Sequence, residues 1–163
     1  MNKQSEKMLS EAYELCEDGD YFEAIKLYNQ IIKKEPKNVN ALIDKAVTLQ
    51  TLGKIKQALS LYDKALKIEP SNLDALLNKG SALHTIEKYY EAISCYDAAT
   101  KIDKKCAMAL AYKGLSLGEL GNFEDAIKFF KKALTIDRDY DLANISKKMA
   151  QKLLKESKKT KTQ

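Results

Sequence analysis

The chain has 163 residues, enough for one domain or one run of repeats with a buried core, and its formal net charge is +5. Apolar residues make up 45% and charged residues 31% of the sequence, proportions that are typical of a folded soluble protein and too apolar for general disorder. With only 6 Gly and 2 Pro, the sequence lacks the turn residues that an all-β sandwich or barrel needs, so the composition favours helices.

No stretch of the sequence has the length of a membrane span. The longest unbroken apolar run is the seven residues from Cys106 to Tyr112, whereas a helix needs about 20 apolar residues to cross a bilayer. The polar start of the sequence, from Met1 to Lys7, indicates no secretory signal. Three cysteines at irregular spacing indicate thiols in a reducing compartment, so we expect a cytoplasmic protein.

A regular repeat organises the sequence, and its period of about 34 residues is typical of a helical repeat array. Alanine recurs at this step at Ala24, Ala58, Ala92 and Ala126. An aromatic residue recurs four positions later, at Tyr28, Tyr62, Tyr96 and Phe130. We therefore expect four repeats within residues 5–140, and we place them at 5–38, 39–72, 73–106 and 107–140.

Each repeat is predicted to contain two helices. In the second repeat the first helix has one apolar face, formed by Leu42, Ala46 and Leu49. Gly53 follows, a residue that adopts a left-handed turn without strain, and Pro70 prevents the second helix from continuing. The second helix has its own apolar face, formed by Ala58, Leu61, Tyr62, Ala65 and Leu66.

The segment 141–156 begins like a fifth repeat and is predicted to be a capping helix. We expect its apolar face to cover the fourth repeat through Leu142, Ile145, Met149 and Leu153. We expect the opposite face to point into water through Lys147, Lys148, Lys152 and Lys155. Residues 157–163 are predicted to be a basic flexible tail. The stretch 147–163 contains seven lysines and a single acidic residue, so the positive charge belongs to the end of the array and not to the repeats.

This pattern resembles the tetratricopeptide repeat. The first repeat carries it at Gly19, Tyr21, Ala24, Tyr28, Ile31 and Pro36, and the fourth at Leu110, Gly114, Leu117, Gly121, Phe123, Ala126, Phe130 and Ala133. The resemblance implies an all-α fold, a right-handed superhelical solenoid of antiparallel helix pairs whose first helices line a concave groove. Glu87 departs from the pattern where Gly is usual, and a non-glycine residue at positive φ costs on the order of 1 kcal/mol.

The resemblance also implies which residues line the groove. They are Leu9, Tyr13, Ile43, Asp44, Val47, Leu77, Asn78, Ser81, His84, Ala111, Tyr112 and Leu115, with Cys16, Gln50 and Gly118 in the same row as His84. Much of this lining is apolar, and an exposed apolar strip indicates a partner site. Two interpretations remain open: the strip binds an amphipathic helix, an apolar peptide or another copy of the chain, or the array buries part of the strip against itself.

One subclass of the family is disfavoured by the charges in this groove. Chaperone-binding members hold a C-terminal carboxylate in a clamp of lysine, arginine and asparagine side chains. The matching positions in the first three repeats hold Leu9, Tyr13, Asp44, Asp74 and Asn78, and those in the next window hold Ile43, Val47, Asn78, Met108 and Tyr112. Neither set contains a cation, and Asp44 and Asp74 would repel a carboxylate.

No constellation of residues indicates catalysis, a metal or a cofactor. His84 is the one histidine in the sequence, and it has no cysteine at ligand spacing. The sequence has neither a readable Ser-His-Asp arrangement nor a glycine-rich phosphate loop. We therefore expect a non-catalytic protein that binds no cofactor.

Taken together, these features predict a scaffold or adaptor for protein–protein interaction, whose groove binds a peptide or a helix. One alternative is a structural protein that associates with itself and buries the same strip. Another is binding of RNA or an acidic surface through the Lys-rich end. Nucleic acid is disfavoured because residues before that end carry no net basic charge.

Overall fold

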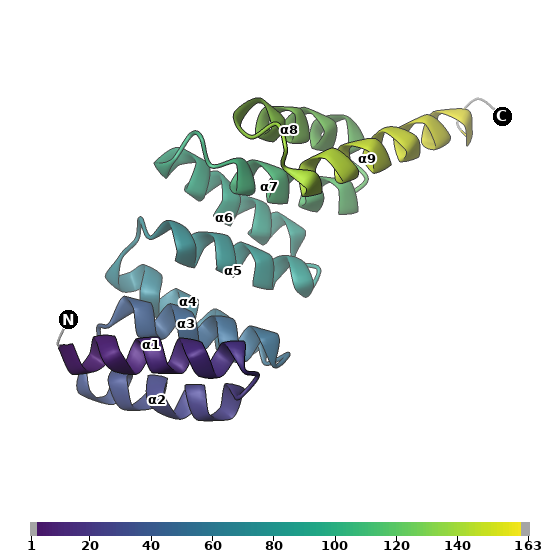
Figure 1. The fold of residues 1–163 in the computed structure, drawn as a ribbon. Coiled ribbons are helices and arrows are strands. Elements are labelled where there is room, and N and C mark those ends of the chain that lie inside the picture. The colour runs from purple at the N-terminus through teal and green to yellow at the C-terminus, as the bar shows by residue number, and fades with distance from the viewer. Residues whose placement is uncertain (1–2, 161–163) are drawn as a thin grey trace. The chain divides into compact units, whose positions relative to one another are not determined.

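The computed structural model describes residues 3–160, and within them the fold is entirely α-helical. The helices are α1 (Lys3–Glu17), α2 (Tyr21–Lys34), α3 (Val39–Thr51), α4 (Ile55–Ile68), α5 (Leu73–Thr85), α6 (Tyr89–Ile102), α7 (Ala107–Glu119), α8 (Phe123–Ile136) and α9 (Asp141–Thr160). The first eight form four helix-turn-helix pairs and α9 follows them (Figure 1). The predicted all-α class and the four repeats with a C-terminal helix are therefore confirmed.

The chain divides into two compact units between Ala82 and Leu83, inside α5. In the N-terminal unit, α1 packs on α2, α2 on α3, and α3 on α4. In the C-terminal unit, α6 packs on α7, α7 on α8, and α9 packs on both α8 and α7. Each unit is thus a stack in which consecutive helices are neighbours, as the antiparallel helix pairs of a repeat array require.

Local chemistry sets the helix ends. The turns inside three of the pairs contain a glycine at positive φ, at Gly19, Gly53 and Gly121, and the remaining turn contains Glu87 at φ 61°. The strained position expected at Glu87 is therefore present. Between pairs, a side chain caps the next helix: Asn38 Oδ1 accepts a hydrogen bond from the Ala41 amide at 3.0 Å, and Cys106 Sγ takes the same place at 3.4 Å from the Ala109 nitrogen.

The cores alternate small and large residues, as the sequence pattern indicates. Each recurring alanine from Ala24 to Ala126 is fully buried, and so are the aromatic side chains one turn later, which are at most 2% exposed. The alanines allow the helix axes to approach, and the aromatic rings fill the space between helices. Cys95, beside Tyr96, is also buried.

Helix α9 differs from the prediction in its length and in the face that it buries. It continues to Thr160, four residues past the predicted end, and residues 161–163 of the predicted tail lie outside the described residues. The buried residues are Ala143 and Ala150, whereas Ile145 is 67% exposed and Met149 64% exposed. The expectation that Ile145 covers the fourth repeat was wrong. Leu142 is half-buried, and Met149 and Leu153 lie beside α7 and α8 but remain exposed. The cause is the repeat spacing: Ala143 and Ala150 succeed Ala109 and Ser116 of α7, and these small residues permit close helix packing.

Candidate binding surfaces on the first helices

Eight of the twelve predicted groove residues fall into two registers with different exposure. We define the inner register as the residues Leu9, Ile43, Leu77, Ala111 and Ile145, which recur once in each repeat. Ile43, Leu77 and Ala111 are 6%, 8% and 0% exposed, respectively, and Leu9 is half-buried. For Ile43, Leu77 and Ala111 the second interpretation holds: the chain buries them against itself. Ile43 lies in a core with Ala75, and Ala111 in a core with Ala143.

The outer register, four residues further along each first helix, remains accessible. It consists of Tyr13, Val47, Ser81, Leu115 and Met149. Tyr13 is 63% exposed and Val47 39%, while Ser81 and Leu115 are half-buried. Met149 was not predicted as a surface residue, although its place one full repeat after Leu115 contained the signal. Among the predicted groove residues, the apolar side chains that are exposed are therefore Tyr13 and Val47 of the outer register.

Polar side chains join successive first helices next to these registers. Cys16 Sγ lies 3.4 Å from Thr48 Oγ1, Gln50 Nε2 donates to Ser81 Oγ at 3.4 Å, and His84 Nδ1 lies 2.9 Å from Ser116 Oγ. The corresponding pair between α7 and α9 is Gly118 and Ala150, which have no polar side-chain atoms. The three predicted positions Cys16, Gln50 and His84 thus serve the internal structure of the array.

A cleft opens where that fourth pair is missing. It has a volume of about 340 Å³ and lies within the C-terminal unit, between α7, α8 and α9. Its lining is Leu115, Gly118, Glu119, Phe123, Phe130, Ser146, Met149, Ala150 and Leu153. A Cβ atom added to Gly118 would meet no other atom within 4 Å. The cleft is apolar and accessible, and it is lined by the predicted groove residue Leu115 and by Gly118 of the His84 row.

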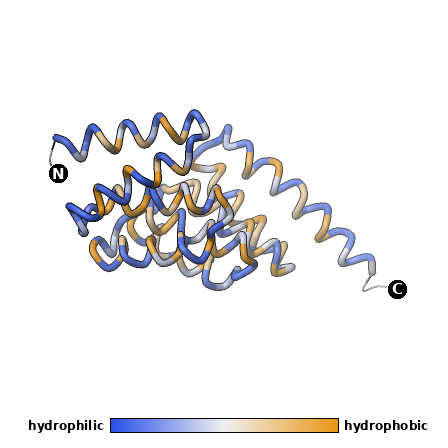
Figure 2. The backbone as a smooth tube through the Cα atoms, turned by 90° about the horizontal axis from the view of Figure 1, so that it is seen from below, coloured by the Kyte–Doolittle hydropathy of each residue, from blue (hydrophilic) through white to orange (hydrophobic). Residues whose placement is uncertain are grey.

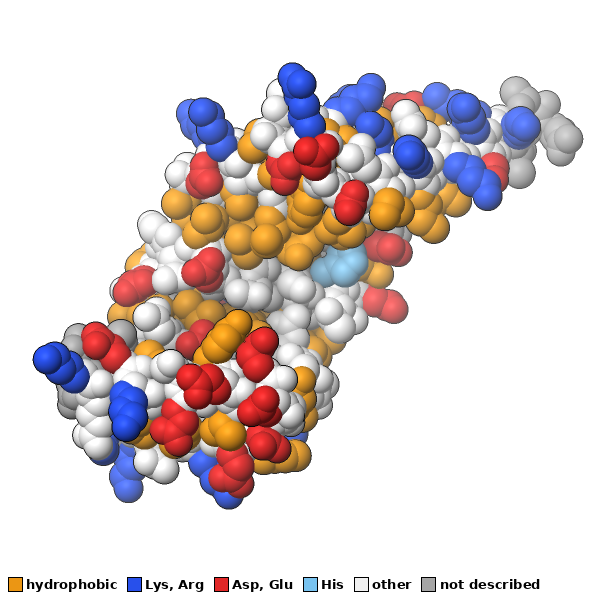
Figure 3. Space-filling view, viewed as in Figure 1, with side chains coloured by type: hydrophobic (Ala, Val, Ile, Leu, Met, Phe, Trp, Pro, Cys, Tyr) orange, Lys and Arg blue, Asp and Glu red, His pale blue; other side chains and the backbone are white. Residues whose placement is uncertain are grey.

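The groove residues of the N-terminal unit have acidic character. Burial, reinforced by the charge of Asp74, raises the pKa of Asp44 to about 6. Burial also raises the pKa of the Tyr62 hydroxyl, and the charge of Asp44 adds to the effect. Asn78 donates its side-chain amide to the Asp74 carbonyl at 2.9 Å. Figure 3 shows acidic side chains gathered on the N-terminal unit. This surface suits a neutral or cationic segment better than a carboxylate.

His84 and Tyr112 are held by aromatic contacts. The His84 ring meets Tyr89 edge to face at 5.2 Å between centroids, and the Tyr112 ring meets Tyr96 at 5.7 Å. Burial lowers the pKa of His84, so the imidazole is neutral near pH 7. Between residues 3 and 160 no three His, Cys, Asp or Glu side chains are grouped so that they could hold a metal ion. These contacts give His84 a packing role.

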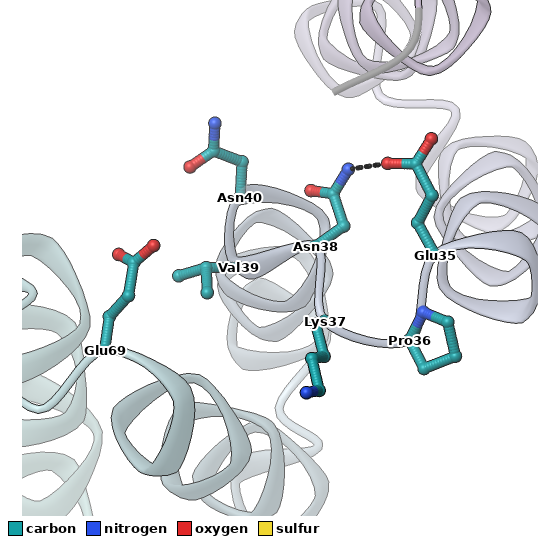
Figure 4. Close-up of a pocket in the computed structure, with 7 residues that line it drawn as sticks. All are labelled: Glu35, Pro36, Lys37, Asn38, Val39, Asn40 and Glu69. Carbon is teal, nitrogen blue, oxygen red and sulfur yellow. Dashed lines mark hydrogen bonds between the residues drawn. The ribbon is translucent and has the colours of Figure 1, made fainter.

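Another hollow surrounds the connection between α2 and α3 (Figure 4). Its lining includes Pro36 and Lys37 from the connection and Glu69 from the end of α4. Glu35 accepts a hydrogen bond from the Asn38 amide at 2.8 Å, and Asn38 in turn caps α3. These polar groups already satisfy one another as a helix cap, so the hydrogen bonds of this hollow serve the internal structure of the connection.

Sequence comparison identifies the family. Residues 6–111 match the family model described as "Psidin, N-terminal TPR repeats region", and residues 107–140 match the model described as "Tetratricopeptide repeat". The chain belongs to the tetratricopeptide repeat family. Domains of this family are typically protein–protein interaction scaffolds and are usually non-catalytic. No match was found among the curated proteins.

Solved structures share the fold. A MamA protein matches with a TM-score of 0.81 and 23% identity, over 94% of this chain and 84% of MamA. A tetratricopeptide repeat protein from Parabacteroides merdae matches with a TM-score of 0.82 and 22% identity, over 95% of this chain and 62% of that one. The first TPR of Spaghetti, bound to the HSP90 peptide SRMEEVD, matches with a TM-score of 0.69 and 22% identity, over 71% of this chain and 92% of that one.

No helix between residues 3 and 160 is both long enough and apolar enough to cross a bilayer. Helix α9 is the longest at 20 residues, and its lysines give it a polar face. Figure 2 shows apolar and hydrophilic residues alternating along α9. This alternation is typical of a helix with one face against a protein surface.

Proposed function

We propose that this protein is a non-catalytic scaffold that binds apolar or amphipathic segments of partner proteins through the outer register of the first helices within each unit. The observation that supports the proposal is the contrast between the registers. Ile43 is 6% exposed, whereas Val47, four residues later on the same helix, is 39% exposed and Tyr13 is 63% exposed. Removing such apolar area from water would drive association.

The charges around the outer register favour one kind of segment in the N-terminal unit. The TPR of Spaghetti is described as bound to an HSP90 peptide rich in acidic residues. Here Asp44 and Asp74 occupy positions where a carboxylate clamp would need cations. A partner segment on this unit should therefore be apolar with neutral or basic flanks, because buried like charges repel strongly.

Affinity capture from the cell that makes the protein tests this proposal. The variant Val47→Glu with Leu115→Glu places a charge in the outer register of each unit, and we expect it to lose the captured partner. The matched control is Tyr90→Glu on α6, where an aromatic side chain is 73% exposed but lies on a second helix. Equal capture by the wild type and the double variant would overturn the proposal. Ile43 and Leu77 are unsuitable targets because they are buried, and a charge there would unfold the chain.

Self-association would bury the same residues. The same variants distinguish it from binding to a different protein. Light scattering over a range of concentrations reports the mass in solution. A dimer that the Val47→Glu and Leu115→Glu variant converts to a monomer would identify the partner segment as a second copy. A monomer at all concentrations would leave a different protein as the partner.

A further inference from the structure

We propose that the cleft between α7, α8 and α9 binds the apolar anchor of an acidic amphipathic helix from a partner protein, and that the lysines of α9 pair with the acidic flank of that helix. This inference rests on the proposed scaffold function and specifies the chemistry of the partner at one site.

The cleft lies where a polar side-chain contact between neighbouring first helices is absent. In the same unit, the space between α5 and α7 is bridged by His84 and Ser116, whose side-chain atoms lie 2.9 Å apart. Between α7 and α9 the equivalent residues are Gly118 and Ala150. The resulting cleft of about 340 Å³ is lined by Leu115 and by aromatic residues of α8, so it suits a large apolar side chain.

The apolar lining of the cleft is continuous with an exposed apolar strip along α9. Ile145, Met149 and Leu153 follow one another at steps of four and are 67%, 64% and 37% exposed. On α3, α5 and α7 the inner-register residue is buried, and Ala111 of α7 is 0% exposed, but Ile145 is uncovered. Figure 3 shows apolar side chains along the edge of α9 below its lysines. Apolar residues at this spacing can pack against the apolar face of a partner helix that lies along α9.

The charge beside the strip indicates the partner. Lys148, Lys152, Lys155 and Lys159 line a hollow on the neighbouring side of α9, together with Gln151 and Glu156. Lys152 and Glu156 form a pair at 4.0 Å, and the Lys152 side chain is 77% exposed. Glu119, at the end of α7, lies on the wall of the cleft opposite α9. A partner helix would therefore carry carboxylates on the flank that meets these lysines and none on the flank that meets Glu119.

A basic amphipathic helix can also lie on an anionic membrane, and the shape of the site decides between the two partners. A membrane surface would contact Ile145 and Met149 but could not enter a cleft whose floor includes Gly118 and Ala150. A helix with a projecting aromatic or leucine side chain can enter it. We therefore assign the site to a protein helix.

Fluorescence anisotropy with two synthetic helices tests the assignment. Both probes are about 18 residues long and carry Leu and Phe at i, i+4 and i+7. One has Glu along a single flank and the other has Lys at the same positions. We expect the wild type to bind the Glu probe about tenfold or more tightly than the Lys probe at low salt. Reversing two charges, in Lys148→Glu with Lys152→Glu, should invert that preference. The control Lys104→Glu with Lys105→Glu, in the exposed α6–α7 connection, should leave it unchanged.

A variant that fills the cleft tests whether the probe binds inside it. Gly118→Leu adds a side chain into open space within a helix, so the protein should fold at least as stably as the wild type. We expect this variant to lose the Glu probe. Equal binding of the probe by Gly118→Leu and the wild type would overturn the proposal. So would binding of anionic vesicles, equal in both proteins, without binding of either probe. If Gly118→Leu keeps the cellular partner that Val47→Glu with Leu115→Glu loses, the scaffold function stands and the cleft assignment fails.

Discussion

Gly114 of α7 faces the ring of Phe130 on α8 so closely that a Cβ atom at Gly114 would lie 2.7 Å from Cε1 of that ring. Phe130 is 2% exposed and cannot move into solvent. In the first two repeats the equivalent residues are Ala12 and Ala46, which are 0% exposed. The fourth pair therefore packs closer at this point than an alanine would allow.

Replacing this glycine should destabilise the C-terminal unit. We expect Gly114→Ala to lower the free energy of unfolding by about 1–3 kcal/mol, because overpacking a buried site displaces its neighbours. The matched control is Gly118→Ala in the same helix, where the added Cβ meets open space. That change should stabilise by about 0.5–1 kcal/mol through helix propensity alone. Urea unfolding measures both, and a Gly114→Ala variant as stable as Gly118→Ala would contradict the contact.

The turn between α5 and α6 contains a second site of strain. Glu87 adopts φ 61°, a conformation that its three counterparts adopt as glycine. We expect Glu87→Gly to stabilise the protein by about 1 kcal/mol, the usual strain of a non-glycine residue in the left-handed region. Thermal unfolding measures the gain. Glu87→Ala keeps the strain and removes the carboxylate, so it separates charge from conformation. An equal gain in both variants would contradict the conformational explanation.

The turns of the repeats could be predicted because the residues that form turns and caps act locally. Gly53 takes its left-handed turn and Asn38 caps its helix whatever packs nearby. Because these residues recur with the repeat period, the same helix pair could be predicted for each repeat.

The exposure of the groove residues could not be predicted in the same way. Ile43 and Val47 are both apolar and one turn apart, and only the position of the neighbouring helix decides that one is buried and the other exposed. On α9, Ile145 and Met149 have the hydrophobicity of packing residues, yet Ala143 and Ala150 make the contact. Close packing selects small residues, which a reading of hydrophobicity alone overlooks. The cleft depends on Gly118, whose missing side chain gives no signal by itself.

The raised pKa of Asp44 predicts how stability depends on pH. Its pKa is about 6 in the folded chain and 3.8 without the fold, so folding favours the protonated form. The contribution of Asp44 to stability is therefore complete below pH 4 and is lost as the pH rises through 6. We expect Asp44→Asn to gain about 1–2 kcal/mol at pH 7, after allowing for the exposed part of the side chain, and almost nothing at pH 4.

Denaturant unfolding at both pH values measures this difference. Asp74→Asn removes the smaller of the two causes and should give a smaller gain at pH 7. A gain for Asp44→Asn that is equal at pH 4 and pH 7 would show that the amide stabilises the site by another route.

An ion-pair ladder, in which a lysine of a first helix pairs with an aspartate of the preceding second helix, stops before α9. Lys79 Nζ lies 2.7 Å from Asp63 Oδ1, and one repeat later Lys113 Nζ lies 2.5 Å from Asp97 Oδ1. The next step of the repeat pairs Lys147 with Lys131, two like charges. We expect Lys131→Asp to add the missing ion pair and to stabilise the docking of α9 by about 0.5–1 kcal/mol at low salt.

Hydrogen exchange of the α9 amides reports this local gain, since amides exchange when the helix detaches. Lys131→Ala is the control, because it removes the repulsion without supplying a carboxylate. The slowing of exchange should be greater for Lys131→Asp than for Lys131→Ala, and the difference should shrink in high salt. Identical exchange in the two variants would mean that Lys147 gains nothing from a carboxylate at this position. The ladder would then be a feature of α5 and α7 that the stacking of α9 does not require.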